Sequence, residues 1–306
     1  MLPLPRRALF LALLTIAACD SSPAPAPPTA TAHPAARATA PARPSSLITA
    51  RPYTMRAPAS HAATAPLLVL LHGYGSDHAN VATHLGIAPL ADSHGFYVAL
   101  PDGTPDRDGA RFWNASDACC DFDNLAVDDV AYLDAILDDA LARYPIDPAR
   151  IYVAGFSNGG FMAHRYACDR ASRVTAVVSF AGEPWKDATK CVPTIPVSVL
   201  QVQGDADEVV LYGGGRPSDG RLRGAKFARA GVFPGAREAA AMWGTKDGCP
   251  EPSRTDDPRE ETLRYGPCKE GSAVELWTRH GERHVLSWSP ADGERMWTFL
   301  AAHTRR

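Results

Sequence analysis

The stretch 151–169, IYVAGFSNGGFMAHRYACD, decides the fold of this chain. It opens with a short apolar run that contains β-branched residues, and such a run predicts a buried strand. The glycine-flanked segment GFSNG (155–159) follows at once, and a helical pattern then continues to about Cys168. The stretch therefore predicts a strand that passes into a helix through a tight turn, with Ser157 at the tip of that turn.

Apolar runs and helical patterns alternate on both sides of this stretch. The runs that predict strands are 66–75, 95–103, 150–156, 174–182, 197–207 and 273–280, and the patterns that predict helices are 123–145, 158–168, 236–249 and 293–303. Strands that alternate with helices indicate an α/β fold with a mostly parallel central sheet and helices on both faces. Residues 211–270 are rich in Gly, Pro and charge, and apart from the helix at 236–249 we expect irregular loops there.

Length and composition exclude some classes of protein. The chain has 306 residues, of which 45% are hydrophobic and 21% charged, with a formal net charge of -3. This composition is typical of a globular protein. The weak negative balance argues against a nucleic-acid-binding protein, because phosphate binding needs a concentrated basic patch. No apolar run beyond the N-terminus is long enough to span a membrane, which takes about 18 residues or more.

The N-terminal segment 1–19, MLPLPRRALFLALLTIAAC, is typical of an export signal. A basic pair precedes an apolar run that is too short to span a bilayer, and small residues follow. The ending IAAC resembles a bacterial lipobox, so we expect lipidation of Cys19 and attachment to a bacterial membrane on its periplasmic or cell-surface face. The alternative is a plain secretory signal and a secreted protein. Residues 20–50 are rich in Pro, Ala, Ser and Thr and predict a disordered tether, so the folded α/β domain is expected at 51–306.

The cysteines also indicate an exported protein. Besides Cys19, the chain contains Cys119, Cys120, Cys168, Cys191, Cys249 and Cys268. An even number of cysteines in an exported chain predicts disulfides. No CxxC or HExxH spacing is present, so we expect no metal site.

Position along the chain suggests how the cysteines pair, although six cysteines allow 15 pairings. A Cys168–Cys191 bridge would join the end of the helix after Ser157 to the segment after the next strand. A Cys249–Cys268 bridge would hold a polar loop in order. The adjacent pair Cys119 and Cys120 then forms either a vicinal disulfide or two buried thiols, and we favour the disulfide.

Ser157 lies in a Gly-x-Ser-x-Gly pattern between a predicted strand and a predicted helix. This is the context of the nucleophile elbow of α/β-hydrolases, whose tight turn leaves the serine hydroxyl exposed above the sheet. The alternative is a glycine-rich turn in which the serine only caps the helix. Neither a metal nor a cofactor is expected.

A serine nucleophile needs a base and an acid that orients the base. In α/β-hydrolases these follow the serine in the order acid, then histidine, on loops after later strands. The strand at 197–207 leads to Asp205 and Asp207, and the strand at 273–280 leads to His284. We predict Asp207 as the acid, with Asp205 as a turn residue, and His284 as the base, with His280 as the alternative.

The oxyanion of an acyl-transfer intermediate needs two N–H donors. One is expected from Asn158, the residue after the serine, and the other from Tyr74 in the loop HGYGSD (72–77) after the first strand. His72 ends that strand, and we interpret it as a structural histidine.

Four segments together resemble one family. They are LLVLLHGYGSD (67–77), the block from Val127 to Asp169, VLQVQGDADEVVLYGG (199–214) and GERHVLSW (281–288). They are similar to the polyhydroxybutyrate depolymerase and feruloyl esterase-like α/β-hydrolases. The resemblance implies that Asp207 is the acid, because that family commonly reads HGTADPVV where this chain has QGDADEVV. The family's histidine segment has more glycines than GERHVLSWSP (281–290), so the resemblance is weaker there.

The resemblance implies a serine esterase whose substrates range over hydroxyalkanoate oligomers, feruloyl esters and acetylated sugars. Residues that could line its pocket are Trp113, Phe156, Trp185 and Trp288. We expect a monomer whose partner is a small or oligomeric ester. Two alternatives stay open. One is a serine peptidase of related fold, and the other is a catalytically inactive surface binding protein.

Overall fold

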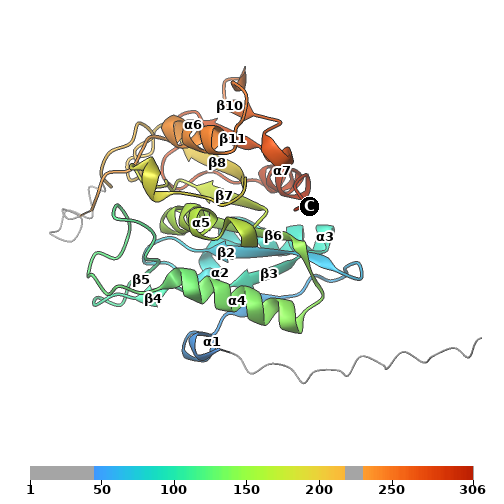
Figure 1. The fold of residues 1–306 in the computed structure, drawn as a ribbon. Coiled ribbons are helices and arrows are strands. Elements are labelled where there is room, and N and C mark those ends of the chain that lie inside the picture. The colour runs from blue at the N-terminus through green and yellow to red at the C-terminus, as the bar shows by residue number, and fades with distance from the viewer. Residues whose placement is uncertain (1–44, 218–229, 306) are drawn as a thin grey trace, which may run out of the picture. The chain divides into compact units, whose positions relative to one another are not determined.

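The computed structural model describes residues 45–217 and 230–305, and in these residues nine strands form one central sheet (Figure 1). The strand order is β1-β3-β2-β6-β7-β8-β11-β10-β9. The six strands from β3 to β11 pair in parallel, whereas β1, β10 and β9 pair antiparallel at the two edges. The strands of the sheet are β1 (Thr54–Arg56), β2 (Ala65–Leu71), β3 (Tyr97–Leu100), β6 (Ile146–Phe156), β7 (Ala176–Phe180), β8 (Ser198–Gly204), β9 (Ser253–Asp256), β10 (Glu260–Tyr265) and β11 (Val274–Arg279). A separate hairpin consists of β4 (Thr104–Pro105) and β5 (Arg111–Phe112).

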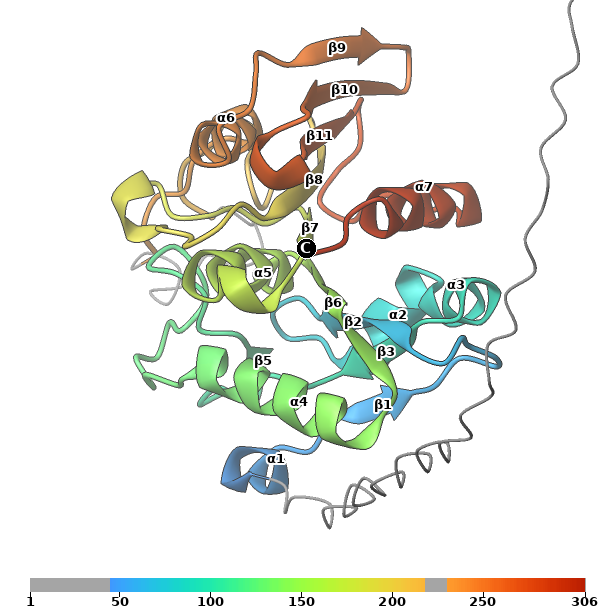
Figure 2. The same ribbon diagram turned by 45° about the vertical axis from the view of Figure 1, so that its right-hand side comes forward.

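Helices cover both faces of the sheet (Figure 2). They are α1 (Ser46–Ala50), α2 (His78–His84), α3 (Ile87–His94), α4 (Asp129–Arg143), α5 (Asn158–Asp169), α6 (Ala236–Lys246) and α7 (Pro290–Ala301). Side chains of α4, α5 and α6 belong to one buried apolar cluster, and side chains of α2, α3 and α7 belong to a second. The predicted α/β architecture with helices on both faces is therefore confirmed.

The strand β2 shows how the sequence produces this arrangement. All seven of its residues are buried. Leu67, Val69 and Leu71 pack in the first cluster and Leu68 and Leu70 in the second, because side chains alternate between the two faces of a strand. A parallel strand that is covered on both faces needs this unbroken apolar run.

The hairpin of β9 and β10 corrects one prediction. We expected only loops and a helix between residues 211 and 270, but β10 pairs with β11 along its whole length and β9 pairs with β10. All four residues of β9 are exposed, and the sequence of β10 is EETLRY. Such polar strands at a sheet edge lack the apolar run that predicts a strand, so their pairing depends on the neighbouring strand β11.

Helix α1 corrects the boundary of the predicted tether. The side chain of Ser45 caps this helix by accepting the N–H of Ile48, whose side chain is buried against the first apolar cluster. Arg51 continues the contact through an ion pair of 2.7 Å with Asp129. Residues 45–50 therefore belong to the folded unit, which comprises Pro41–Arg306. The predicted signal segment, Cys19 and residues 20–44 lie outside the described residues.

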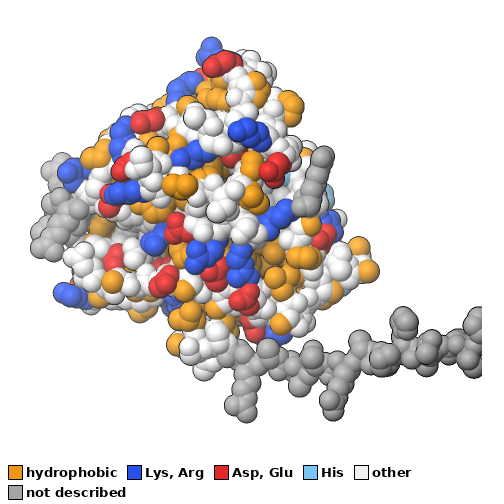
Figure 3. Space-filling view, in the orientation of Figure 1, with side chains coloured by type: hydrophobic (Ala, Val, Ile, Leu, Met, Phe, Trp, Pro, Cys, Tyr) orange, Lys and Arg blue, Asp and Glu red, His pale blue; other side chains and the backbone are white. Residues whose placement is uncertain are grey.

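The surface mixes both signs of charge. Figure 3 shows Lys and Arg side chains interspersed with Asp and Glu over the face in view. Ion pairs of exposed side chains include Lys186 with Glu238 and Arg254 with Asp256. None of the described helices combines the length and the apolar character needed to cross a membrane.

Candidate active site

The turn between β6 and α5 holds Ser157 in a backbone conformation that is rare for residues other than glycine. Its φ is 54° and its ψ is -118°. A side chain at Gly155 would place Cβ 2.1 Å from the carbonyl oxygen of Gly159, and one at Gly159 would place it 2.3 Å from that of Leu71. Both positions must therefore be glycine. Strain of this kind, kept by tight packing, is typical of functional sites, and it leaves the serine side chain at the tip of the turn.

The structure brings Ser157, His284 and Asp207 together from three separate segments. Nε2 of His284 lies 2.9 Å from Oγ of Ser157, and Nδ1 lies 2.9 Å from Oδ2 of Asp207. A carboxylate only accepts, so Nδ1 carries the proton and Nε2 is free to accept the serine proton. The Asp207 side chain is wholly buried. Its other oxygen accepts the N–H groups of Val209 and Val210 at 2.8 and 2.9 Å, which hold the carboxylate in place.

The alternative base, His280, is engaged elsewhere. Its Nδ1 lies 2.9 Å from Asp205 Oδ2, and its Nε2 lies 3.0 Å from Asp256 Oδ1. Hydrogen bonds to Asp205 and Asp256 raise the pKa of His280. Asp205 also accepts the N–H of Gly281 at 2.7 Å, so it ties β11 to the end of β8 in addition to shaping a turn. Both ring nitrogens of His280 therefore bind carboxylates at the edge of the sheet.

The two predicted oxyanion donors lie beside Ser157. Asn158 is the first residue of α5, and its backbone N–H is one of those that have no acceptor within the helix. The loop that carries Tyr74 passes close to the serine, because a Cβ on Gly73 would lie 3.4 Å from Cβ of Ser157. His72 holds this loop by donating from Nδ1 to the Gly73 carbonyl at 2.7 Å and accepting the Gly103 N–H at Nε2 at 2.9 Å. Burial lowers the pKa of His72, which keeps this ring neutral and structural.

The predicted pocket residues separate into two groups. Trp113 is wholly buried, and its indole N–H donates to the carbonyl of His72 at 3.0 Å. Its backbone N–H and C=O both bond to the side chain of Asn158, at 2.7 and 2.8 Å. Trp113 is therefore a core residue that supports the site, and its prediction as a pocket residue is wrong, because an exposed position cannot be told from a buried one in so irregular a loop.

The other three aromatic residues are partly exposed. The Phe156 ring lies 5.2 Å from the His284 ring, measured between centroids. Trp288 lines a cavity of about 370 Å³ together with His84 and Leu90. Trp185 lines a second cavity, of about 470 Å³, whose wall includes polar side chains such as Asn114, Asp121 and Arg165. Neither cavity is lined by Ser157, His284 or Asp207, so the two tryptophans are not shown to line a pocket at the serine.

Glu183 is a buried acid that the sequence analysis did not single out. It follows β7, is wholly buried, and its Oε1 accepts from Nε2 of Gln201 at 3.2 Å. Oε2 has no hydrogen-bond partner among the described residues. Burial, and then the nearby charge of Asp207, raise the pKa of Glu183 well above its usual value. A single acid at the end of the apolar run VTAVVSFAG was the signal that could have found it.

A chain of buried hydrogen bonds continues from Gln201 away from Ser157. Oε1 of Gln201 accepts from Nε2 of His164 at 2.9 Å, and Nδ1 of His164 accepts from the indole N–H of Trp243 at 3.0 Å. Burial lowers the pKa of His164 to about 4. The ring is therefore neutral at pH 7, and it joins α5, α6 and β8 behind the site.

The structure pairs the six cysteines as predicted. The three disulfides are Cys119–Cys120, Cys168–Cys191 and Cys249–Cys268. The second joins the last turn of α5 to the segment after β7, as expected for a bridge behind Ser157. In residues 45–217 and 230–305, no group of His, Cys, Asp and Glu side chains has an arrangement that could hold a metal ion.

Comparison with known proteins identifies relatives that are named as esterases. A family model described as esterase PHB depolymerase matches residues 52–215. Feruloyl esterase B of Piromyces equi is 30% identical over 239 residues, which are 77% of this chain and 42% of that protein. A bifunctional acetylxylan esterase/xylanase of Neocallimastix patriciarum is 27% identical over 81% of this chain and 32% of its own length. Poly(3-hydroxyalkanoate) depolymerase C of Paucimonas lemoignei is 30% identical over 43% of this chain and 31% of its own length. The chain thus spans less than half the length of each of these relatives.

Solved structures of esterases share the fold. An acetyl xylan esterase from Aspergillus awamori superposes with a TM-score of 0.59 at 15% identity, over 81% of this chain and 93% of that one. The esterase PE8 superposes with a TM-score of 0.53 at 21% identity, over 82% of this chain and 98% of that one. Together with the parallel sheet and its two helical layers, these likenesses confirm the predicted α/β-hydrolase fold.

Proposed function

Because the chain belongs to the esterase PHB depolymerase family, we propose that it is a serine esterase that hydrolyses carboxylic esters through an acyl-enzyme. The observation that carries this proposal is the pair of hydrogen bonds from His284 to Ser157 and Asp207, each 2.9 Å long, at the tip of a glycine-flanked turn. A nucleophile, a base and an orienting acid in this arrangement are the requirements for acyl transfer by a serine hydrolase.

Each group has one task in the proposed reaction. Oγ of Ser157 attacks the ester carbonyl carbon while Nε2 of His284 takes the hydroxyl proton. Asp207 accepts from Nδ1 and stabilises the imidazolium that forms. The negative charge that develops on the carbonyl oxygen is met by the backbone N–H groups of Tyr74 and Asn158. His284 then gives its proton to the departing alcohol, and a water molecule, activated by the same ring, releases the acid.

The proposed substrates are esters of hydroxyalkanoate oligomers, of hydroxycinnamic acids such as ferulic acid, or of acetylated sugars. The names of the relatives span these three groups. Neither the cavity at Trp288 nor the one at Trp185 is lined by Ser157, His284 or Asp207, so their volumes do not discriminate among these substrates.

The test is Ser157→Ala measured against a panel of short-chain nitrophenyl, feruloyl, acetyl-xylan and hydroxybutyrate esters. We expect the wild-type chain to cleave at least one of them and to react with a fluorophosphonate probe. The variant should lose both properties with its fold intact, because loss of a triad serine costs about a millionfold in turnover. Ser253→Ala, at an exposed position of β9, is the control that should keep both. Near-normal turnover by folded Ser157→Ala would refute the proposal.

A further inference from the structure

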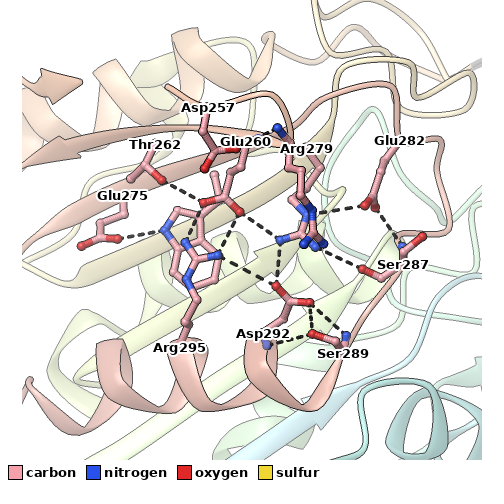
Figure 4. Close-up of polar contacts among 12 residues, drawn as sticks. Asp257, Glu260, Thr262, Glu275, Arg279, Glu282, Ser287, Ser289, Asp292 and Arg295 are labelled. Atoms are coloured by element: carbon pink, nitrogen blue, oxygen red, sulfur yellow. Dashed lines mark hydrogen bonds and ion pairs between the residues drawn. The ribbon is translucent and has the colours of Figure 1, made fainter. Parts of the chain in front are cut away.

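A buried cluster of charged side chains lies where β10, β11 and α7 meet (Figure 4). Arg279 ends β11, and its side chain is only 6% exposed. Its Nη1 donates to Oε2 of Glu260 at 2.9 Å and to Oδ1 of Asp292 at 2.8 Å. Arg295 of α7 donates to both oxygens of Glu260, at 2.6 and 3.1 Å. We refer to these four side chains, together with Glu282, as the Arg279 cluster.

The Arg279 cluster reaches the loop that carries His284. This loop, residues 280–289, joins β11 to α7. Nη2 of Arg279 donates to the carbonyl of Ser287 at 3.3 Å, and Nε lies 3.6 Å from Oε1 of Glu282. Oε2 of Glu282 accepts the N–H of Ser287 at 2.8 Å. Glu282 and Ser287 lie on either side of His284 in the sequence. They are bonded to each other, and both contact Arg279.

Glu282 and Ser287 form the base of the loop, which we call its neck. The neck is also attached to the strand that leads to Asp207. The carbonyl of Glu282 accepts the N–H of Ala206 at 3.1 Å. A Cβ on Gly204, the last residue of β8, would lie 2.1 Å from that carbonyl oxygen, so the two backbones are in direct contact. Within the loop, Val285 is 65% exposed, whereas Leu286 is buried in the second apolar cluster. The path of the loop past Ser157 is therefore set by the contacts at its neck and by the burial of Leu286.

From these contacts we propose that Arg279 is a positioning residue, which holds the His284 loop so that the imidazole reaches both Ser157 and Asp207. The inference rests on the proposed function. A planar guanidinium has five donors in a rigid fork and can bind Asp292, Glu260 and Ser287 at once. The ammonium of a lysine is a compact charge and cannot replace that fork. Reacting groups must be held within a fraction of an ångström, and a shift of 1 Å can cost about a hundredfold in rate.

Two substitutions test the neck of the loop. Arg279→Lys keeps the positive charge among the carboxylates but loses the fork, and Glu282→Ala removes the bond to Ser287 without touching the buried acids Glu260 and Asp292. We expect each to lower kcat on a soluble nitrophenyl ester by roughly ten- to a hundredfold with KM little changed. The rate of fluorophosphonate labelling should fall in parallel. Glu282→Gln retains an acceptor for the Ser287 N–H and should recover most of the lost kcat.

The matched control is Arg264→Gln. Arg264 lies on β10 and forms an ion pair of 2.6 Å with Glu275, on the same pair of strands but away from the loop. It should leave kcat unchanged. All variants are compared by thermal unfolding, and if Arg279→Lys does not fold, the two Glu282 variants decide. Wild-type kcat in folded Arg279→Lys or in folded Glu282→Ala, or an equal fall in Arg264→Gln, would overturn this inference and leave the proposed function standing. A wild-type chain that neither cleaves an ester nor labels would overturn the proposed function and this inference with it.

Discussion

At the scale of single residues, His280 and His284 show how surroundings decide a role. They lie four positions apart at the end of the same strand. Both nitrogens of His280 face carboxylates, whereas His284 faces one carboxylate and one hydroxyl. Only the second environment leaves a ring nitrogen directed at a nucleophile. Glu183 adds a different case, because burial and the nearby charge of Asp207 raise the pKa of this acid and so disfavour a second negative charge there.

We therefore expect substitutions of the two histidines to have opposite effects on kcat. His284→Ala should lower kcat by about a millionfold, as removal of the base does in a serine hydrolase. His280→Ala should keep kcat within the range of wild type and lower only stability, because Asp205 and Asp256 each lose the bond to the imidazole. Ester hydrolysis and thermal unfolding of both purified variants check this. An active His284→Ala with an inactive His280→Ala would transfer the role of base to position 280.

At the scale of elements, the end of α6 holds a buried acid, Asp247, whose ionisation is unfavourable in the folded chain. Asp247 is the C-cap of α6, and its Oδ1 accepts the N–H of Val197 at 3.4 Å just before β8. Its Oδ2 has no partner among the described residues. Burial raises the pKa of Asp247 to about 7. The junction between α6 and β8 is therefore packed around a carboxyl that is protonated in the folded state over much of the acidic range.

This junction predicts a pH dependence of stability. The unfolded chain ionises Asp247 near pH 4 and the folded chain near pH 7, so its contribution is fully present below pH 4 and is lost as pH rises from about 4 to about 7. The slope is at most about 1.4 kcal/mol per pH unit. Asp247→Asn should remove this loss and be more stable than wild type at pH 8. Denaturant unfolding at pH 4, 6 and 8 measures the difference.

Asp257 provides a control, because its pKa is shifted in the opposite direction to that of Asp247. Hydrogen bonds from the backbone N–H groups of Arg259 and Glu260 lower the pKa of Asp257. Its contribution is therefore present at neutral pH and lost as pH falls through that lowered pKa. Asp257→Asn should lose stability at pH 8, where Asp247→Asn gains it. Equal effects of the two substitutions at pH 8 would contradict the assignment of Asp247 as a destabilising buried acid.

At the scale of the whole molecule, the folded unit and the N-terminal segment have separate tasks in our proposal. The unit Pro41–Arg306 contains every residue of the candidate site. The segment 1–19 has the pattern of a bacterial lipobox, and three disulfides favour an oxidising compartment. We therefore propose an exported enzyme that is anchored to a membrane through a lipid on Cys19, with residues 20–44 as the tether.

Cys19→Ser tests the anchor. If Cys19 is lipidated, the wild-type protein should partition into detergent, since two acyl chains give stable membrane attachment. The variant should remain unprocessed or be found in the aqueous phase, with ester hydrolysis by the folded unit retained. Identical partitioning of the two proteins would exclude the lipid anchor and leave the plain secretory signal.

Features that depend on local patterns could be predicted from the sequence alone. Fully apolar runs specify strands buried on both faces, and the glycines around Ser157 specify the turn, because no side chain fits there. The order of the strands then led to Asp207 and His284, and the position of each cysteine led to the three pairs. These features need only neighbours in the chain or the general rules of parallel sheets.

The tertiary structure alone decided what depends on distant partners. The strands β9 and β10 form because β11 offers a pairing edge to β10 and β10 offers one to β9, although their own residues are mostly polar. Trp113 is buried because Asn158 and His72, far away in the sequence, bind it. His284 rather than His280 faces Ser157 because the neck of its loop is held against β8 and Arg279. Contacts of this kind join residues that no periodicity relates, so only the packed chain reveals them.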